Sequence, residues 1–141
     1  MGFSAKTTYA LLALIELASV QACGERLQVA EIAARQAIPE RYLEQMMTSL
    51  RRGGLLRSSR GPRGGYQLAR PAGQISLAEA IHCLEGQASG TPAATSPEQQ
   101  VLEQLAADLQ QQRMARLTAI TLAQLLEQRD ALLQAQAMYF I

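Results

Sequence analysis

Hydrophobic residues recur at helical spacing in two short stretches, residues 29–36 and 39–52, which are separated by a short turn. In the second stretch the apolar positions share one side: Leu43, Met46, Met47 and Leu50. A short turn between two amphipathic helices is typical of a helix-turn-helix. Residues 55–59 and 66–69 then form two short runs joined by a glycine-rich turn, and this pattern predicts a β-hairpin.

The opposite side of stretch 39–52 is polar. Its side chains combine cations, an amide, a hydroxyl and a carboxylate: Arg41, Gln45, Thr48, Arg52 and Glu44. These groups are the ones that pair with base edges in the major groove of DNA. An ordinary solvated helix face would also be polar, but the basic hairpin that follows at once favours DNA reading.

Arginines gather at the predicted hairpin. Arg60 and Arg63 lie in its glycine-rich turn, and Arg57 comes just before it. Cations at an exposed tip can reach phosphates or enter a minor groove. Glycines allow positive φ and close backbone approach, so Gly64 joins the DNA-binding candidates. We therefore expect residues 57–66 to act as a wing beside a recognition helix at residues 39–52.

Three motifs in this region carry a family resemblance: PERYLEQ at 39–45, LRRGGL at 50–55 and RGPRGGYQL at 60–68. They closely resemble winged-helix regulators of the IscR, NsrR and CymR type (Rrf-two family). The resemblance extends from about residue 3 to residue 133. It implies a mainly α fold, a winged helix-turn-helix with a two-stranded wing plus a long C-terminal dimerisation helix. It also implies a sequence-specific transcriptional regulator of double-stranded DNA, with repression as the expected outcome.

Helices are expected on both sides of this region. Ser4 can cap a first helix that runs to about Val20, apolar on most sides and therefore buried on most sides. Lys6 near its start could reach a phosphate or simply be an exposed lysine. Ser76 and Glu79 have the spacing of a capping box, which predicts a short helix that ends near Leu84.

A long helix is expected in the C-terminal part. Ser96 can cap it, Pro97 suits its first position, and it should end at Leu117 or Thr118. A helix this long cannot bury its apolar stripe on a small winged helix alone. The stripe residues predicted to meet a second copy in a homodimer are Leu102, Leu105 and Leu109.

A last helix should follow directly. Thr121 and Gln124 form a second capping box, and the helix is expected to run to about Leu133. The leucines predicted to be buried along it are Leu122, Leu125, Leu126, Leu132 and Leu133. The chain then divides into a DNA-binding domain at 1–85, a flexible loop at 86–96, rich in small residues and uncharged, and a helical dimerisation region at 97–141.

The net charge of the N-terminal half, and not that of the whole chain, supports a nucleic-acid partner. The formal net charge is +1, but residues 1–70 contain ten Lys/Arg against five Asp/Glu, and residues 71–141 contain three against seven. Local charge determines phosphate attraction. No run is long enough to span a bilayer and no signal peptide opens the chain, so we expect a soluble, cytoplasmic protein without a membrane partner. No catalytic grouping of residues is evident, so an enzyme is not expected.

Cysteine content separates this chain from some of the proteins that it resembles. Several of them hold an iron–sulfur cluster through three cysteines, whereas residues 85–116 here contain neither Cys nor His. We therefore predict no cofactor and no metal, and regulation by a small-molecule effector or a partner protein. The alternative function is a protein-interaction regulator that binds a metabolic enzyme, with DNA binding secondary or lost. The sequence names no operator or effector and gives no role to Cys23 or Cys83.

Overall fold

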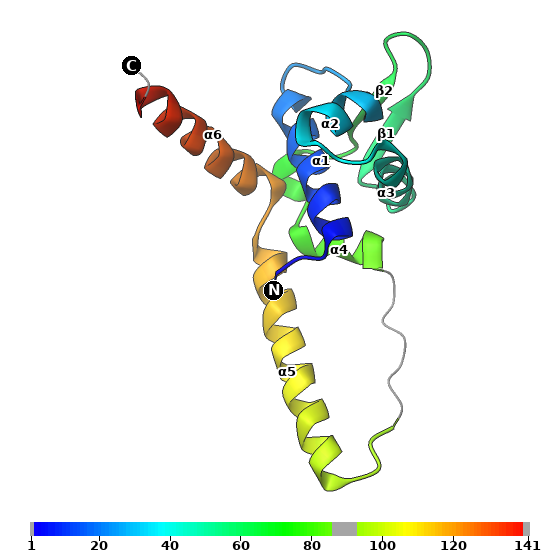
Figure 1. Ribbon diagram of the computed structural model, residues 1–141, viewed down its shortest axis with the longest axis vertical. Helices are drawn as coiled ribbons and strands as arrows, with labels where there is room; N and C mark the ends of the chain where they lie inside the picture. The colour runs from blue at the N-terminus through cyan, green and yellow to red at the C-terminus, as the bar shows by residue number, and fades with distance from the viewer. Residues whose placement is uncertain (1, 86–92, 140–141) are drawn as a thin grey trace.

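The computed structural model describes residues 2–85 and 93–139. Its elements follow the chain in the order α1 (Ala5–Gln21), α2 (Val29–Gln36), α3 (Glu40–Arg52), β1 (Leu56–Ser59), β2 (Gly65–Leu68), a 3-10 turn η1 (Ala72–Gln74), α4 (Leu77–Glu85), α5 (Pro97–Ala119) and α6 (Leu122–Tyr139). In Figure 1, α1 to α4 and the hairpin form one body, and α5 and α6 project away from it in different directions.

The body is organised around α1, whose Ser4 cap accepts a hydrogen bond from the Thr7 amide. Because α1 is apolar on most sides, it can contact α2, α3, α4, β2 and α6. Its central side chain, Leu14, is fully buried, as are Leu43 and Leu50 on α3. The core is therefore aliphatic and sits between α1, α3 and α4.

The hairpin pairs β1 with β2 in antiparallel register and gains a third partner from the loop after α1. The amide of Leu27 donates to the Tyr66 carbonyl at 3.0 Å, and the Tyr66 amide donates to the Leu27 carbonyl at 2.7 Å. Gly65 permits this approach, since a Cβ there would lie 2.6 Å from the Leu27 oxygen, and its φ is +142°. Strand β2 is therefore hydrogen-bonded to β1 on one edge and to Leu27 on the other.

The turn of the helix-turn-helix places Ala37 in the left-handed region, with φ 54° and ψ 46°. Glycine takes this conformation readily and alanine does so at a cost of about 1–2 kcal/mol. Ile38 is buried directly after it. Pro39 is the N-cap of α3 and not its first helical residue, so the recognition helix begins at Glu40, one position later than predicted.

A short backbone ladder fixes the C-terminal helices to the body. The Leu77 amide donates to Ile120 and the Leu122 amide donates to Ile75, at 2.9 and 3.0 Å. The predicted Thr121–Gln124 capping box is confirmed, because each amide donates to the other residue's side-chain oxygen. The junction between α5 and α6 therefore rests on the start of α4.

Several predictions about the helix ends were wrong. Helix α5 ends at Ala119, and α6 continues to Tyr139, well past Leu133. Leu132 and Leu133 are 65% and 50% exposed, because α6 leaves the body after its first turns and none of the described residues covers its far end. Residues 86–92 of the predicted flexible loop lie outside the described residues. None of the described helices could cross a membrane.

Two polar side chains also have other partners than expected. Lys6 donates to the Leu84 carbonyl at 3.1 Å, at the end of α4, and this bond replaces the phosphate contact considered from the sequence. Ser76 caps the Glu79 amide as predicted, but the Glu79 carboxylate pairs with Arg70. Both contacts tie α4 to neighbouring segments.

Candidate nucleic-acid interface

Helix α3 presents one apolar and one polar side, as the sequence predicted. Leu43, Met46, Met47 and Leu50 are at most 1% exposed. Arg41, Glu44, Gln45 and Arg52 are exposed on the other side, and Thr48 is half-buried. The helix is anchored by its leucines and methionines, so the polar side chains are free to meet a ligand. The structure therefore brings these five candidates together on one helix side.

Local hydrogen bonds restrict two hydroxyls on α3. Thr48 Oγ1 donates to the Glu44 carbonyl at 2.9 Å, and Ser49 Oγ donates to the Gln45 carbonyl at 3.2 Å. Within the described residues, the side chains of Arg41, Glu44 and Gln45 form no hydrogen bond or ion pair. Their donors and acceptors therefore remain available, as do those of Arg52 on the same side of the helix.

The wing carries its arginines outward. Arg57, Arg60 and Arg63 are exposed, and in the described part of the chain none of them forms an ion pair. Gly64 is buried, and a Cβ there would lie 2.3 Å from the Ser59 carbonyl oxygen. Its role in the structure is therefore to close the turn that presents the arginines.

Two exposed side chains near these candidates were missed by the sequence reasoning. Tyr42 follows Arg41 on α3, is 61% exposed, and lines a hollow of about 260 Å³ with Arg41 and Gln45. Arg26 lies in the loop before α2 and lines a second hollow with Arg63. Tyr42 could have been recognised as an aromatic residue beside the apolar stripe of α3. Arg26 could not, because only the pairing of Leu27 with Tyr66 brings its loop to the wing.

Cys83 lies behind α3, on α4. Gly53 ends α3, and a Cβ at Gly53 would lie 2.2 Å from the Cys83 sulfur, so the two helices meet closely there. Burial raises the pKa of the Cys83 thiol, and the nearby Glu79 carboxylate raises it further, against a smaller opposite effect of Arg70. The thiol is therefore a protonated packing group at neutral pH. His82 beside it is exposed.

The chain's donor set does not suit an iron–sulfur cluster, which needs about four ligands, mostly thiolates. The whole sequence contains two cysteines and one histidine. Cys23 is exposed in the loop after α1, whereas Cys83 is half-buried on α4. Among the described residues, no three His, Cys, Asp or Glu side chains gather in a way that could hold a metal ion.

Comparison with known protein families gives a match over most of the chain. The Rrf2 model, described as iron-dependent transcriptional regulator, matches residues 3–128. The chain belongs to the Rrf2 family. This membership confirms the resemblance seen in the sequence and the prediction that the chain is not an enzyme, since the Rrf2 family is one of transcriptional regulators. The family model is described as iron-dependent, whereas this chain has only two cysteines.

Curated relatives also support the Rrf2 assignment. IscR of Cereibacter sphaeroides is 46% identical over 86 residues, which are 60% of this chain and 56% of that protein. ORF2 of Azotobacter vinelandii is 36% identical over 135 residues, covering 92% of this chain and 82% of that protein. The chain spans about half the length of the first curated relatives that it matches.

Solved structures extend the likeness over nearly the whole fold. IscR of T. potens has a TM-score of 0.76 at 31% identity, over 92% of this chain and 88% of that chain. CymR of B. subtilis, titled the global cysteine regulator, has a TM-score of 0.76 at 30% identity, over 90% and 97%. The predicted winged-helix architecture with a long C-terminal helix is therefore confirmed.

Proposed function

We propose that this Rrf2-family chain is a dimeric, sequence-specific DNA-binding regulator that recognises an inverted-repeat operator, with repression as its outcome. The observation that carries the proposal is the division of α3 into a fully buried apolar side and an exposed side, where Arg41, Glu44 and Gln45 have no side-chain partner among the described residues. Side chains of these types discriminate bases in the major groove. The wing arginines add phosphate or minor-groove contacts.

The apolar stripe of α5 supports the dimer. Leu102, Leu105 and Leu109 are 65%, 54% and 55% exposed, on a helix that projects from the body in Figure 1. A contiguous row of exposed leucines is unusual on a monomer and is buried most simply against the same row of a second copy. Two copies related by a twofold axis would present their α3 helices about one DNA turn, or a multiple of it, apart.

The proposal is tested by recovering the genomic DNA that the protein binds under several nutrient and redox conditions, followed by gel shift with the recovered sites. An enriched inverted repeat, bound at least a hundredfold more tightly than random duplex, is expected from the usual specificity ratio of about 10³–10⁷. Equal retention of all sequences would count against sequence-specific regulation.

The wing makes a separate contribution that salt can measure. Replacing both Arg60 and Arg63 by Ala should lower affinity for every duplex and reduce the salt slope by about 0.9 for each phosphate that the wing no longer neutralises. Arg116→Ala combined with Arg129→Ala removes the same number of charges from α5 and α6, far from the wing, and serves as control. An unchanged slope in the wing variant would contradict this role.

Signalling without a cluster is part of the proposal. Because the chain has only two cysteines, on different elements, we expect anaerobically purified protein to be colourless and Cys83→Ser to bind DNA as the parent does. An effector or partner protein bound near the start of α5, where Thr95, Gln99 and Leu102 line a hollow of about 430 Å³, would change the angle between the two winged helices. Stoichiometric iron and sulfide in a brown protein would refute the cluster-free account.

The far end of α6 favours a second candidate. Leu132, Leu133 and Met138 are 65%, 50% and 76% exposed, and such a surface is suited to a protein partner. In that case the chain would act by binding a metabolic enzyme, with DNA binding secondary. A parent protein that retains no DNA but captures an enzyme through α6 would favour this candidate over the first.

A further inference from the structure

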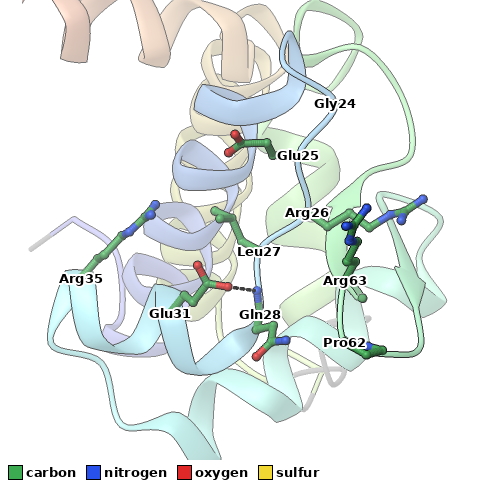
Figure 2. A pocket seen from close by; sticks show the side chains of 10 residues that line it. Gly24, Glu25, Arg26, Leu27, Gln28, Glu31, Arg35, Pro62 and Arg63 are labelled. Atoms are coloured by element: carbon green, nitrogen blue, oxygen red, sulfur yellow. Dashed lines mark hydrogen bonds between the residues drawn. The ribbon is translucent and has the colours of Figure 1, made fainter.

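A hollow of about 420 Å³ lies between the loop before α2 and the turn of the wing. Figure 2 shows Arg63 rising from the wing turn toward Arg26 of the loop, whose side chain extends outward, with Pro62 below them; both arginines line the hollow. Both arginines are exposed. Two segments far apart in the sequence therefore place two cations at one site.

The backbone holds these cations together. Leu27, directly after Arg26, exchanges two hydrogen bonds with Tyr66 on β2, and Gly65 allows the loop backbone to approach. The loop consequently moves with the wing and not independently of it. Arg26 and Arg63 are thereby kept at the edge of the same hollow, where two cations favour an anion between them.

Two acidic side chains, Glu25 and Glu31, also line the hollow, against three arginines. Glu31 accepts the amide of its own helix cap, Gln28, at 3.2 Å. Glu25 points to the opposite side of the loop in Figure 2. Arg35, which also lines the hollow, is already paired with Glu16 at 3.2 Å. In the described residues, Arg26 and Arg63 have no ion pair, so their charge remains available.

We infer that Arg26 and Arg63 together bind a phosphodiester of the DNA backbone, which makes the loop before α2 a third DNA-contacting element beside α3 and the wing. This inference rests on the proposed function. The N–H groups of one guanidinium can donate two parallel hydrogen bonds to two oxygens of a phosphate. Such contacts position the protein on the duplex but carry no information about the base sequence. Arg26 thus contributes affinity and register, while Arg41, Glu44 and Gln45 contribute sequence preference.

The size of the effect follows from counterion release. Each phosphate contact contributes about 0.9 to the salt slope, so the two Arg26 side chains of a dimer contribute about 1.8. If this contribution to log K vanishes at 1 M salt, it amounts to about 1.8 at 0.1 M salt, one decade lower. Arg26→Ala should therefore weaken binding about sixtyfold at 0.1 M salt. The reduction in affinity should be equal on operator and random duplex, because a phosphate carries no sequence information.

The experiment measures affinity for operator and random duplexes from 0.05 to 0.4 M salt, by fluorescence anisotropy. The parent is compared with Arg26→Ala, Arg26→Lys and the control Arg116→Ala, which removes an exposed charge from α5. Arg26→Lys keeps the charge and should retain most of the slope. Circular dichroism and light scattering verify fold and assembly of each variant.

A slope lowered by about 1.8 in Arg26→Ala alone, with an equal reduction in affinity on both duplexes, would support the inference. An Arg26→Ala slope and affinity equal to those of Arg116→Ala would overturn it. A reduction confined to the operator would also overturn it, because Arg26 would then read bases. A parent that binds no DNA at all would instead refute the proposed function itself.

Discussion

The contact between Gly53 and Cys83 gives a sharp test of how α4 positions the recognition helix. Gly53 has φ −77° and ψ −1°, a conformation open to alanine, so the Gly53→Ala variant meets no backbone strain. Its new Cβ would, however, lie 2.2 Å from the Cys83 sulfur and 3.2 Å from the Cys83 Cβ. The predicted penalty is therefore purely a steric one between α3 and α4.

The magnitude follows from two opposing effects. Forcing one extra methyl group into a packed contact costs about 1–3 kcal/mol. Replacing glycine by alanine at a compatible backbone conformation stabilises the folded state by about 0.4–1 kcal/mol, because it lowers the conformational entropy of the unfolded chain. We expect Gly53→Ala to lower the free energy of unfolding by about 0.5–2 kcal/mol. In a Cys83→Ala background the sulfur is gone and only the Cβ contact at 3.2 Å remains, so the same substitution should cost clearly less.

Urea denaturation of the four proteins in this double-mutant cycle measures the coupling directly. All unfolding curves are recorded at one protein concentration, since the stability of a dimer depends on it. A coupling of at least about 1 kcal/mol in favour of the double variant is expected. An equal penalty for Gly53→Ala with and without the Cys83 sulfur would show that α4 does not meet the end of α3 as described.

Three further results are expected from single sites. Ala37→Gly should stabilise the fold by up to about 1 kcal/mol in urea, because it relieves left-handed strain at a smaller entropic cost; a clear decrease in stability would contradict the turn conformation. Leu105→Asp with Leu109→Asp should give monomers or unfolded chains in light scattering, since burying unpaired charge is costly, and a folded dimer would place the interface elsewhere. Iodoacetamide at pH 8 should modify Cys83 more slowly in the native protein than in urea, measured in a Cys23→Ser background, because burial raises the thiol pKa; equal rates would refute this.

The N-terminal fold could be predicted because its signals are local. Helix α2 and the apolar side of α3 follow from residue spacing, and the glycines around Arg63 indicate the wing. The capping pairs at Ser96 and Thr121 give the starts of α5 and α6 correctly. Each of these signals depends on residues close together in the chain, where composition and geometry are directly related.

Long-range contacts account for what the sequence could not predict. Leu132 and Leu133 have the spacing of buried residues, but their burial depends on a surface that residues 2–85 and 93–139 do not provide. Arg26 joins the candidate interface only through the pairing of Leu27 with Tyr66, residues separated by two helices and a strand. The proposed partners of Arg41 and Gln45 are bases outside the protein, so their roles stay predictions.

Selection from a randomised duplex library tests most directly the claim that α3 reads sequence in the major groove. The parent and the variants Arg41→Ala, Glu44→Ala and Gln45→Ala are each carried through selection, with Arg116→Ala as control. We predict an inverted repeat for the parent and the control, and for each α3 variant a weakened preference at one position per half-site, worth about 1–3 kcal/mol. If all three variants select the parental sequence and only bind every duplex more weakly, α3 is not the reading helix.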